Sequence, residues 1–242
     1  MTRDLDAARR FYGAVLDWTF RDTHLGERFA LAYRHGAPVA GFGTLADDLA
    51  LPATWTPYFA TADANLAAAR IRERGATVAV GPLAFGLGRA VLAADPAGAV
   101  FGLWQGEVLE DWRVGHGAAP AWLELRTHGA FAAAIFYGEV LDWAGEAPGS
   151  CVAAYEHDHV VLRHGNDTVA RISGGAVGED PDPHLRPRWH VHFPVPDLEA
   201  AIEAANCAGG RPVSPVETSV ADRRITLRDP EGALFTVLAA QG

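Results

Sequence analysis

The 242-residue chain contains no lysine, and all twenty of its basic side chains are arginine. This absence excludes a Schiff-base lysine and a phosphate-loop lysine from any active site. The arginines form no basic block, and the net charge is −10. Nucleic acid repels such a chain, so we expect no nucleic-acid partner.

Long apolar runs and sorting signals are missing as well. No stretch of about 18 apolar residues occurs, so we expect no membrane-spanning helix. The start, Met1-Thr2-Arg3-Asp4, lacks the apolar core of a signal peptide. The two cysteines, Cys151 and Cys207, have no motif spacing and are expected to be free thiols in a reducing cytoplasm. Sequence motifs of hydrolases, zinc proteases and dinucleotide-binding proteins do not occur.

What the chain does contain is an internal duplication. The segment Phe-Tyr-Gly-Ala-Val-Leu-Asp-Trp at 11–18 returns at 136–143 with seven of eight residues identical. The Asp-Pro-x-Gly turn at 95–98 returns at 229–232, and the offset drifts only from 125 to 134. A module of about 120 residues has therefore been duplicated. We expect two domains at 1–106 and 120–242, joined by a linker at 107–119.

Each repeat is predicted to contain two similar halves with the element order β-α-β-β-β. In the second repeat, a strand at 122–126 precedes a helix that places Phe131, Ala134, Ile135 and Gly138 on one face. Asp197 is predicted to cap the helix of the second half. The first repeat lacks a counterpart of the strand at 122–126, and the open sheet edge that results would allow a homodimer.

These motifs resemble those of the vicinal oxygen chelate superfamily, which includes glyoxalase I, extradiol dioxygenases and bleomycin-binding proteins. The resemblance rests on the two Phe-Tyr-Gly-x-Val-Leu-Asp-Trp segments, the stretch from His190 to Asp197 and the two Asp-Pro-x-Gly turns. It implies an α+β fold of two tandem modules, each a cupped open barrel of two βαβββ halves around a ligand cleft. The tandem layout is similar to proteins found near antibiotic-biosynthesis genes, which implies a role in antibiotic biosynthesis or resistance.

The resemblance also implies where a metal would be held. Metal enzymes of the superfamily carry His or Glu at four inward strand positions. In the second repeat these positions fall on Trp122, near Arg171, on His190 and on Thr236. In the first repeat the first position is missing, and the other three fall near Gly41, on Thr56 and on Gly102. A catalytic divalent ion needs about three protein ligands, and only His190 qualifies. We therefore expect no metal and no other cofactor.

Three inward residues of the second repeat are candidates for acid–base chemistry. His190 and His192 share one face of a strand, and Glu124 lies on the opposing first strand. Each has a structural alternative: two half-buried histidines satisfied by their neighbours, and a Glu124–Arg171 ion pair that stiffens the cup. An irregular His/His/Glu metal set would need a ligand position that the superfamily does not use.

Four further residues are candidates for ligand binding: Trp122, Arg171, Thr236 and Tyr58. An inward arginine suits a carboxylate, phosphate or phenolate, and Tyr58 offers a surface for stacking. The structural alternatives are a solvated position at the rim for Arg171 and core packing for Tyr58. Because the second repeat carries more inward polar groups, we expect the principal site there.

These observations predict a cytoplasmic small-molecule-binding protein of secondary metabolism. It would bind or sequester an aromatic or anionic metabolite in the cup of the second repeat without a metal. Two enzymatic alternatives stay open. One is a metal-free lyase or isomerase that uses Glu124 and His190 or His192 for proton transfer, and the other is a metal-dependent enzyme of the glyoxalase or dioxygenase type.

Overall fold

The computed structural model divides the chain into two compact units, which are not the two sequence repeats. It describes residues 1–23, 26–44, 46, 48, 50–85, 88–107, 122–143, 151–156, 159–165, 167–176 and 186–241. Among these, unit 1 comprises residues 1–55 and 191–241, and unit 2 comprises residues 56–107 and 122–190. Each unit therefore takes one half from each repeat. The predicted linker at 107–119 lies outside the described residues except for Glu107.

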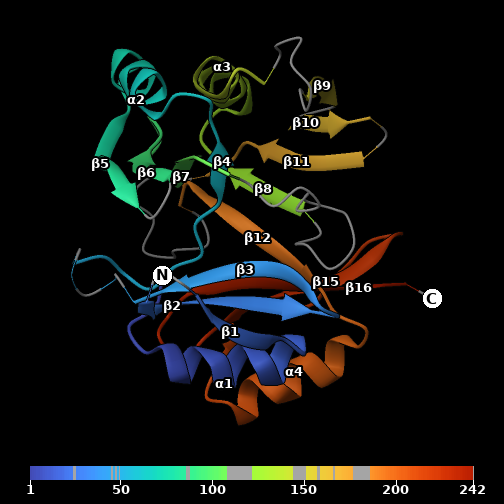
Figure 1. Cartoon of the computed structure of the whole chain (residues 1–242). Coiled ribbons are helices and arrows are strands. Elements are labelled where there is room, and N and C mark those ends of the chain that lie inside the picture. The colour runs from blue at the N-terminus through green and yellow to red at the C-terminus, as the bar shows by residue number, and fades with distance from the viewer. Residues whose placement is uncertain are drawn as a thin grey trace. The chain divides into compact units, whose positions relative to one another are not determined.

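Unit 2 combines the second half of repeat 1 with the first half of repeat 2 (Figure 1). The half from repeat 1 contains β4 (Tyr58–Ala60), α2 (Ala64–Glu73), β5 (Thr77–Phe85), β6 (Gly88–Ala94) and β7 (Val100–Gln105). The half from repeat 2 contains β8 (Trp122–Arg126), α3 (Ala130–Leu141), β9 (Val152–Glu156), β10 (His159–His164) and β11 (Asp167–Ser173). The strand orders are β4-β7-β6-β5 and β8-β11-β10-β9. Both halves show the predicted βαβββ element order.

Unit 1 combines the first half of repeat 1 with most of the second half of repeat 2. The half from repeat 1 contains α1 (Leu5–Leu16), β1 (Thr19–Thr23), β2 (Gly26–Arg34) and β3 (Ala37–Gly43). The half from repeat 2 contains β12 (Arg188–Pro194), α4 (Leu198–Cys207), β13 (Arg211–Pro212), β14 (Glu217–Thr218), β15 (Asp222–Arg228) and β16 (Leu234–Ala240). Strands β1-β2-β3 form a three-stranded sheet, and no strand among the described residues of this half corresponds to β8, as predicted.

Several ends of the helices are set by aspartates in the sequence. Asp4, Asp63 and Asp197 each cap a helix by accepting hydrogen bonds from backbone N–H groups of the first turn, which confirms the predicted cap at Asp197. Helices α1 and α3 both end at the aspartate of the repeated Leu-Asp-Trp segment, where Asp17 and Asp142 adopt left-handed φ angles of 56° and 55°. Identical sequence thus produces the same helix stop in each repeat.

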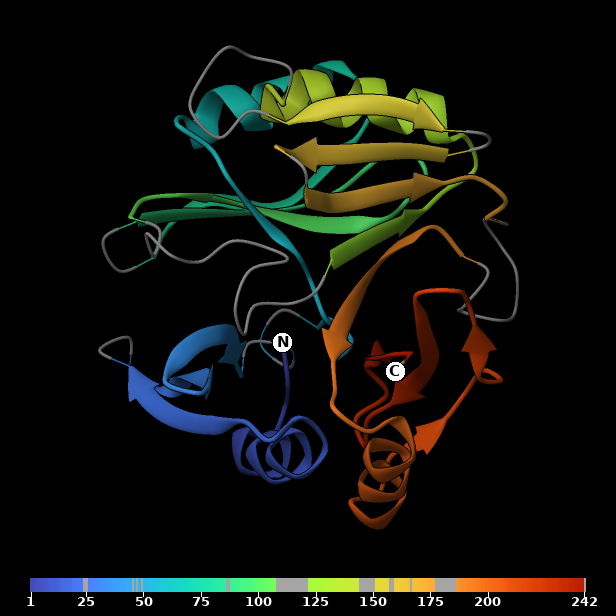
Figure 2. The same ribbon diagram turned by 90° about the vertical axis from the view of Figure 1, so that its right-hand side faces the viewer.

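In each unit the two helices pack against one another and cover one face of the sheets (Figures 1 and 2). We call the opposite sheet face the inner face. Helix α3 turns Ala133, Phe136, Tyr137 and Val140 toward the core. The face that the sequence pattern groups together, with Phe131 and Ile135, is instead the exposed one.

The duplicated motifs meet in the same buried network in each unit. In unit 2, Tyr137 donates to Asp95 Oδ2 at 3.0 Å and accepts from Trp189 Nε1 at 2.9 Å. The corresponding bonds in unit 1 join Tyr12 to Asp229 at 2.8 Å and Trp55 to Tyr12 at 2.9 Å. In both networks the tyrosine comes from one repeat and the aspartate from the other. Because the motifs are duplicated, exchanging the halves satisfies the same polar groups.

None of the described helices is long and apolar enough to cross a membrane.

Candidate functional site

Strand β8 brings three of its side chains to the inner face of unit 2. Leu123 and Leu125 are buried on the helix side, while Trp122, Glu124 and Arg126 alternate with them and are half-buried. A strand points successive side chains to opposite faces, so this burial pattern places the second set on the inner face. Strand β8 therefore contributes an indole, a carboxylate and a guanidinium to the inner face.

Arg171 and Trp122 form a stacked pair on this surface. Strand β11 runs parallel to β8 with Arg171 beside Glu124. The Arg171 Cζ atom lies 5.4 Å from the centroid of the Trp122 ring, which is a cation–π distance. The Arg171 Nε atom is buried and finds no hydrogen-bond partner among the described residues. The guanidinium is thus positioned by an aromatic ring, and its Nε lacks the carboxylate partner that an arginine usually finds.

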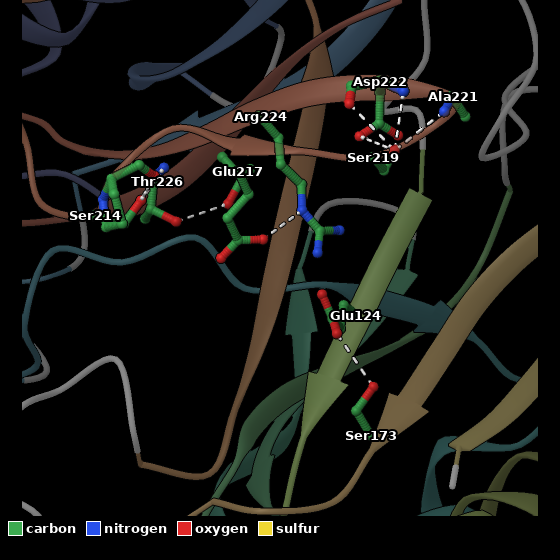
Figure 3. A network of polar contacts seen from close by, with 11 residues as sticks. Glu124, Ser173, Ser214, Glu217, Ser219, Ala221, Asp222, Arg224 and Thr226 are labelled. Atoms are coloured by element: carbon green, nitrogen blue, oxygen red, sulfur yellow. Dashed lines mark hydrogen bonds and ion pairs between the residues drawn. The ribbon is translucent and has the colours of Figure 1, made fainter. Parts of the chain in front are cut away.

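Glu124 accepts a hydrogen bond from Ser173 on β11 at 3.1 Å from Oγ to Oε1 (Figure 3). The two residues stand on neighbouring parallel strands, and Ser173 is two residues beyond Arg171, which stands opposite Glu124. The pair presents a carboxylate acceptor and a hydroxyl close to the Arg171–Trp122 pair. The structure joins Glu124 to Ser173, and the expected Glu124–Arg171 ion pair stays a prediction.

His190 lies against Arg188, two residues earlier on the same strand. The Arg188 Nε donates to His190 Nε2 at 3.2 Å, and Arg188 Nη2 lies 3.1 Å from His190 Nδ1. A guanidinium has donors and no acceptor, and a neutral imidazole accepts through one ring nitrogen only, so one of these two contacts is a hydrogen bond from Arg188 to the ring. The histidine is therefore engaged by a cation of its own strand.

The remaining two candidates of repeat 2 belong to the other unit. His192 and Thr236 are buried and stand opposite one another in the parallel register of β12 and β16. Thr236 Oγ1 lies 3.2 Å from Thr226 Oγ1 on β15. Both residues are part of unit 1, whereas Trp122, Glu124, Arg171 and His190 are part of unit 2. The exchange of halves separates residues that the repeat pattern had grouped.

Tyr58, a candidate from repeat 1, belongs to unit 2 through the same exchange. It stands opposite Gly102 in the parallel pair of β4 and β7. A Cβ atom at Gly102 would lie 2.3 Å from the Tyr58 ring, so only glycine leaves room for the ring there. Partial burial raises the pKa of the Tyr58 hydroxyl and keeps it protonated. The sequence pattern places Gly102 at a metal position and gives no sign of its contact with Tyr58.

The inner-face residues do not fit the superfamily's metal. The metal positions that fall in unit 2 are Trp122, the position near Arg171, Thr56, Gly102 and His190. Only His190 supplies an imidazole or a carboxylate, whereas a catalytic ion needs about three protein ligands. A guanidinium at one of them also repels a cation. Within the described part of the chain, no group of three or more His, Cys, Asp and Glu side chains is arranged to hold a metal ion.

Comparisons with known proteins agree with this architecture. Residues 1–103 match the family model for the Glyoxalase/Bleomycin resistance protein/Dioxygenase superfamily, and residues 122–238 match the model for a glyoxalase-like domain. The Anthracycline biosynthesis protein DnrV of Streptomyces peucetius is 37% identical over 204 residues, which cover 81% of this chain and 70% of the relative. The Putative glyoxylase CFP32 of Mycobacterium tuberculosis is 30% identical over 245 residues, covering 98% of this chain and 91% of the relative. The chain therefore belongs to the glyoxalase/bleomycin resistance protein/dioxygenase superfamily.

Solved structures of this superfamily share the fold. The Mn(II)-bound glyoxalase from Novosphingobium aromaticivorans is 14% identical with a TM-score of 0.56, over 98% of this chain and 78% of the other. A catechol 2,3-dioxygenase is 12% identical with a TM-score of 0.55, over 99% of this chain and 85% of the other. The predicted α+β fold of tandem modules with open sheets is confirmed.

Proposed function

We propose that the chain is a small-molecule-binding protein of secondary metabolism and that the inner face of unit 2 binds an aromatic anion without a metal. The stacked Arg171–Trp122 pair carries this proposal. Trp122 occupies a strand position at which metal enzymes of this fold carry His or Glu, and Arg171 lies near another. Arginine recognises carboxylates and phenolates through paired hydrogen bonds, and an indole ring offers a flat apolar surface.

The neighbouring groups add specificity to this arrangement. Glu124 and Ser173 supply an acceptor and a hydroxyl beside Arg171, and these suit the hydroxyl groups of a ligand. Tyr58, from the other half of unit 2, adds an aromatic ring whose hydroxyl stays protonated. A few placed polar groups among aromatic rings are typical of small-molecule sites.

The names of two relatives support the ligand class. The proteins DnrV of Streptomyces peucetius and DauV of Streptomyces sp. are both named anthracycline biosynthesis proteins, and DauV is 35% identical over 200 residues. Anthracyclines and their precursors are flat polycyclic aromatic compounds with acidic hydroxyl groups. A cation stacked on an indole suits such a compound.

The metal-free enzyme alternative requires a carboxylate and a histidine that cooperate in proton transfer. Glu124 accepts a hydrogen bond from Ser173, His190 lies against Arg188, and His192 belongs to unit 1. The Arg171–Trp122 pair needs no proton transfer in order to hold an aromatic anion. For this reason we place Arg171 at the centre of the site, with Glu124 as a hydrogen-bond acceptor.

A titration with anthraquinone-2-carboxylate, followed by quenching of tryptophan fluorescence, tests the proposal. We expect the wild-type chain to bind this probe and Arg171→Gln to bind it at least tenfold more weakly, a difference of about 1.4 kcal/mol. The matched control is Arg163→Gln in the same half, since Arg163 is ion-paired with Glu156 at 2.6 Å. This control should bind like the wild type.

A neutral probe separates charge recognition from stacking. 2-(Hydroxymethyl)anthraquinone should bind the wild type more weakly than the carboxylate does, and Arg171→Gln should leave its affinity unchanged. Equal affinities of wild type and Arg171→Gln for the carboxylate would show that the proposed site is wrong. Conversion of the probe to a product, lost in Glu124→Gln, would instead support the enzymatic alternative.

A further inference from the structure

An apolar patch is exposed on unit 2, away from the inner face. It consists of Phe131 and Ile135 on α3, which are 65% and 51% exposed, and of Tyr155 on β9, which is 61% exposed. The Phe131 and Tyr155 rings touch edge to face at 6.5 Å between centroids. Strand β9 is the outermost described strand of its sheet. We call these three residues the α3–β9 patch.

The duplication supplies an internal reference for the helical part of the patch. Phe131 and Ile135 correspond to Asp6 and Arg10 of α1 at the common offset of 125 residues. The two helices have the same length, the same stop and the same buried tyrosine. At matching exposed positions, one repeat therefore carries charges and the other carries large apolar side chains.

The edge strands differ in the same way. Asp22 on β1 stands opposite the buried Ala30, and Tyr155 on β9 stands opposite the buried Val160, so the two residues occupy matching places. In unit 1, Arg9 joins α1 to β1 through an ion pair with Asp22. In unit 2, the link from helix to edge strand is the Phe131–Tyr155 ring contact. Unit 1 shows that the fold tolerates charged residues at these places. The fold therefore does not explain why unit 2 has exposed apolar residues there.

We infer that the α3–β9 patch is a dimer interface whose occupant is the same patch of a second copy of the chain. An outer strand offers backbone donors and acceptors to another strand, and exposed apolar side chains beside it are buried by that pairing. A two-fold axis through β9 would pair the strand antiparallel with its own copy and bring both sets of patch residues over the new strand pair.

Opposing residues of the two β9 strands are complementary in size and charge when the two-fold axis passes at Ala154. Ala153 then stands opposite the Tyr155 of the second copy, so that a small residue faces a large one. Glu156 stands opposite Val152, and its carboxylate is already paired with Arg163 at 2.6 Å within its own chain. No like charges oppose one another. Each chain carries a net charge of −10, so an uncharged contact is the kind through which two copies can associate.

Sedimentation velocity of the full chain tests the interface. We expect the wild type to sediment as a dimer of the 25.7 kDa chain at micromolar concentration. Phe131→Asp combined with Ile135→Arg, which restores the residue types of repeat 1, should sediment as a folded monomer with an unchanged circular dichroism spectrum. The control is Leu66→Arg on α2, where Leu66 is 51% exposed in the same unit. This control should remain a dimer.

Cysteine cross-linking tests the strand pairing. Opposite residues of an antiparallel pair have Cα atoms about 4.5–5.5 Å apart, within the range of a disulfide. With Cys151 and Cys207 replaced by serine, Ala154→Cys should form a covalent dimer on mild oxidation, whereas Ala153→Cys should not. A monomeric wild type, a dimeric double variant or dissociation of Leu66→Arg would overturn the interface. Cross-linking of Ala153→Cys in place of Ala154→Cys would overturn the proposed pairing.

Discussion

At the scale of single residues, the duplicated motifs form the same kind of buried hydrogen-bond network in each unit. Tyr137 and Tyr12 are buried, and each donates to a buried aspartate while it accepts from a tryptophan. Burial raises the pKa of Asp95 and Asp229 above the ordinary value, and the hydrogen bond from each tyrosine opposes that rise. Burial and the neighbouring carboxylate hold both tyrosine pKa values well above their usual range. The tyrosines therefore stay protonated and act as donors.

Removing one of these hydroxyls should destabilise the fold in a pH-dependent way. We expect Tyr137→Phe to cost about 1–3 kcal/mol at neutral pH, because it removes the hydroxyl that donates to Asp95 Oδ2 and accepts from the Trp189 N–H. The loss of the hydrogen bond raises the pKa of Asp95 further. A carboxyl group with a raised folded pKa contributes stability that is present in acid and is lost as the pH rises through that pKa. The cost should therefore be smaller in acid than at neutral pH.

Urea denaturation across this pH range measures the effect. Tyr155→Phe is the control, because the Tyr155 side chain is exposed and should lose little stability at any pH. A cost for Tyr137→Phe that is independent of pH would show that Asp95 is not titrating in this network.

The candidate site residues were only partly predictable from sequence. Alternation along β8 correctly indicates that Trp122 and Glu124 share a face, because a strand allows no other arrangement once Leu123 and Leu125 are buried. The partner of Glu124 was not predictable. Ser173 reaches it through the register of two parallel strands that are almost fifty residues apart, and no local pattern sets that register.

At the scale of elements, sequence patterns located the helices and strands but not always their orientation. Helix α3 is apolar nearly all round, so its pattern does not distinguish the buried face from the exposed one. Its orientation is fixed by Tyr137, whose hydroxyl must reach Asp95. Helix α1 carries charges on the matching exposed face, and this contrast becomes informative only when the two helices are superposed in the fold. A single apolar helix gives no such reference.

At the scale of the whole molecule, the exchange of halves could not be predicted. The sequence shows two repeats, and Tyr12 could satisfy the aspartate of its own repeat, Asp95, as well as Asp229. The motifs are nearly identical, so both pairings satisfy the same hydrogen bonds. The structure pairs each tyrosine with the other repeat, and the candidate residues are distributed accordingly. Tyr58 joins Trp122 and Arg171, whereas His192 and Thr236 do not.

A double-mutant cycle tests this exchange directly. Residues in one hydrogen-bond network show coupling energies of about 0.5–3 kcal/mol, and distant residues show almost none. We expect Tyr12→Phe and Asp229→Asn to be coupled in urea denaturation, and Tyr12→Phe and Asp95→Asn to be additive. Coupling between Tyr12 and Asp95 with additivity at Asp229 would mean that each repeat closes on itself.

The central claim is that the inner face of unit 2 binds an aromatic anion through Arg171 and Trp122 without a metal. The most direct test is the affinity for anthraquinone-2-carboxylate before and after exhaustive dialysis against a chelator, with the metal content of each sample measured. We predict the same affinity in both samples, because only one of the unit 2 positions that would hold a metal, His190, carries a metal-binding side chain. Loss of binding after chelation, with recovery on addition of Mn²⁺, Fe²⁺ or Zn²⁺, would contradict the account.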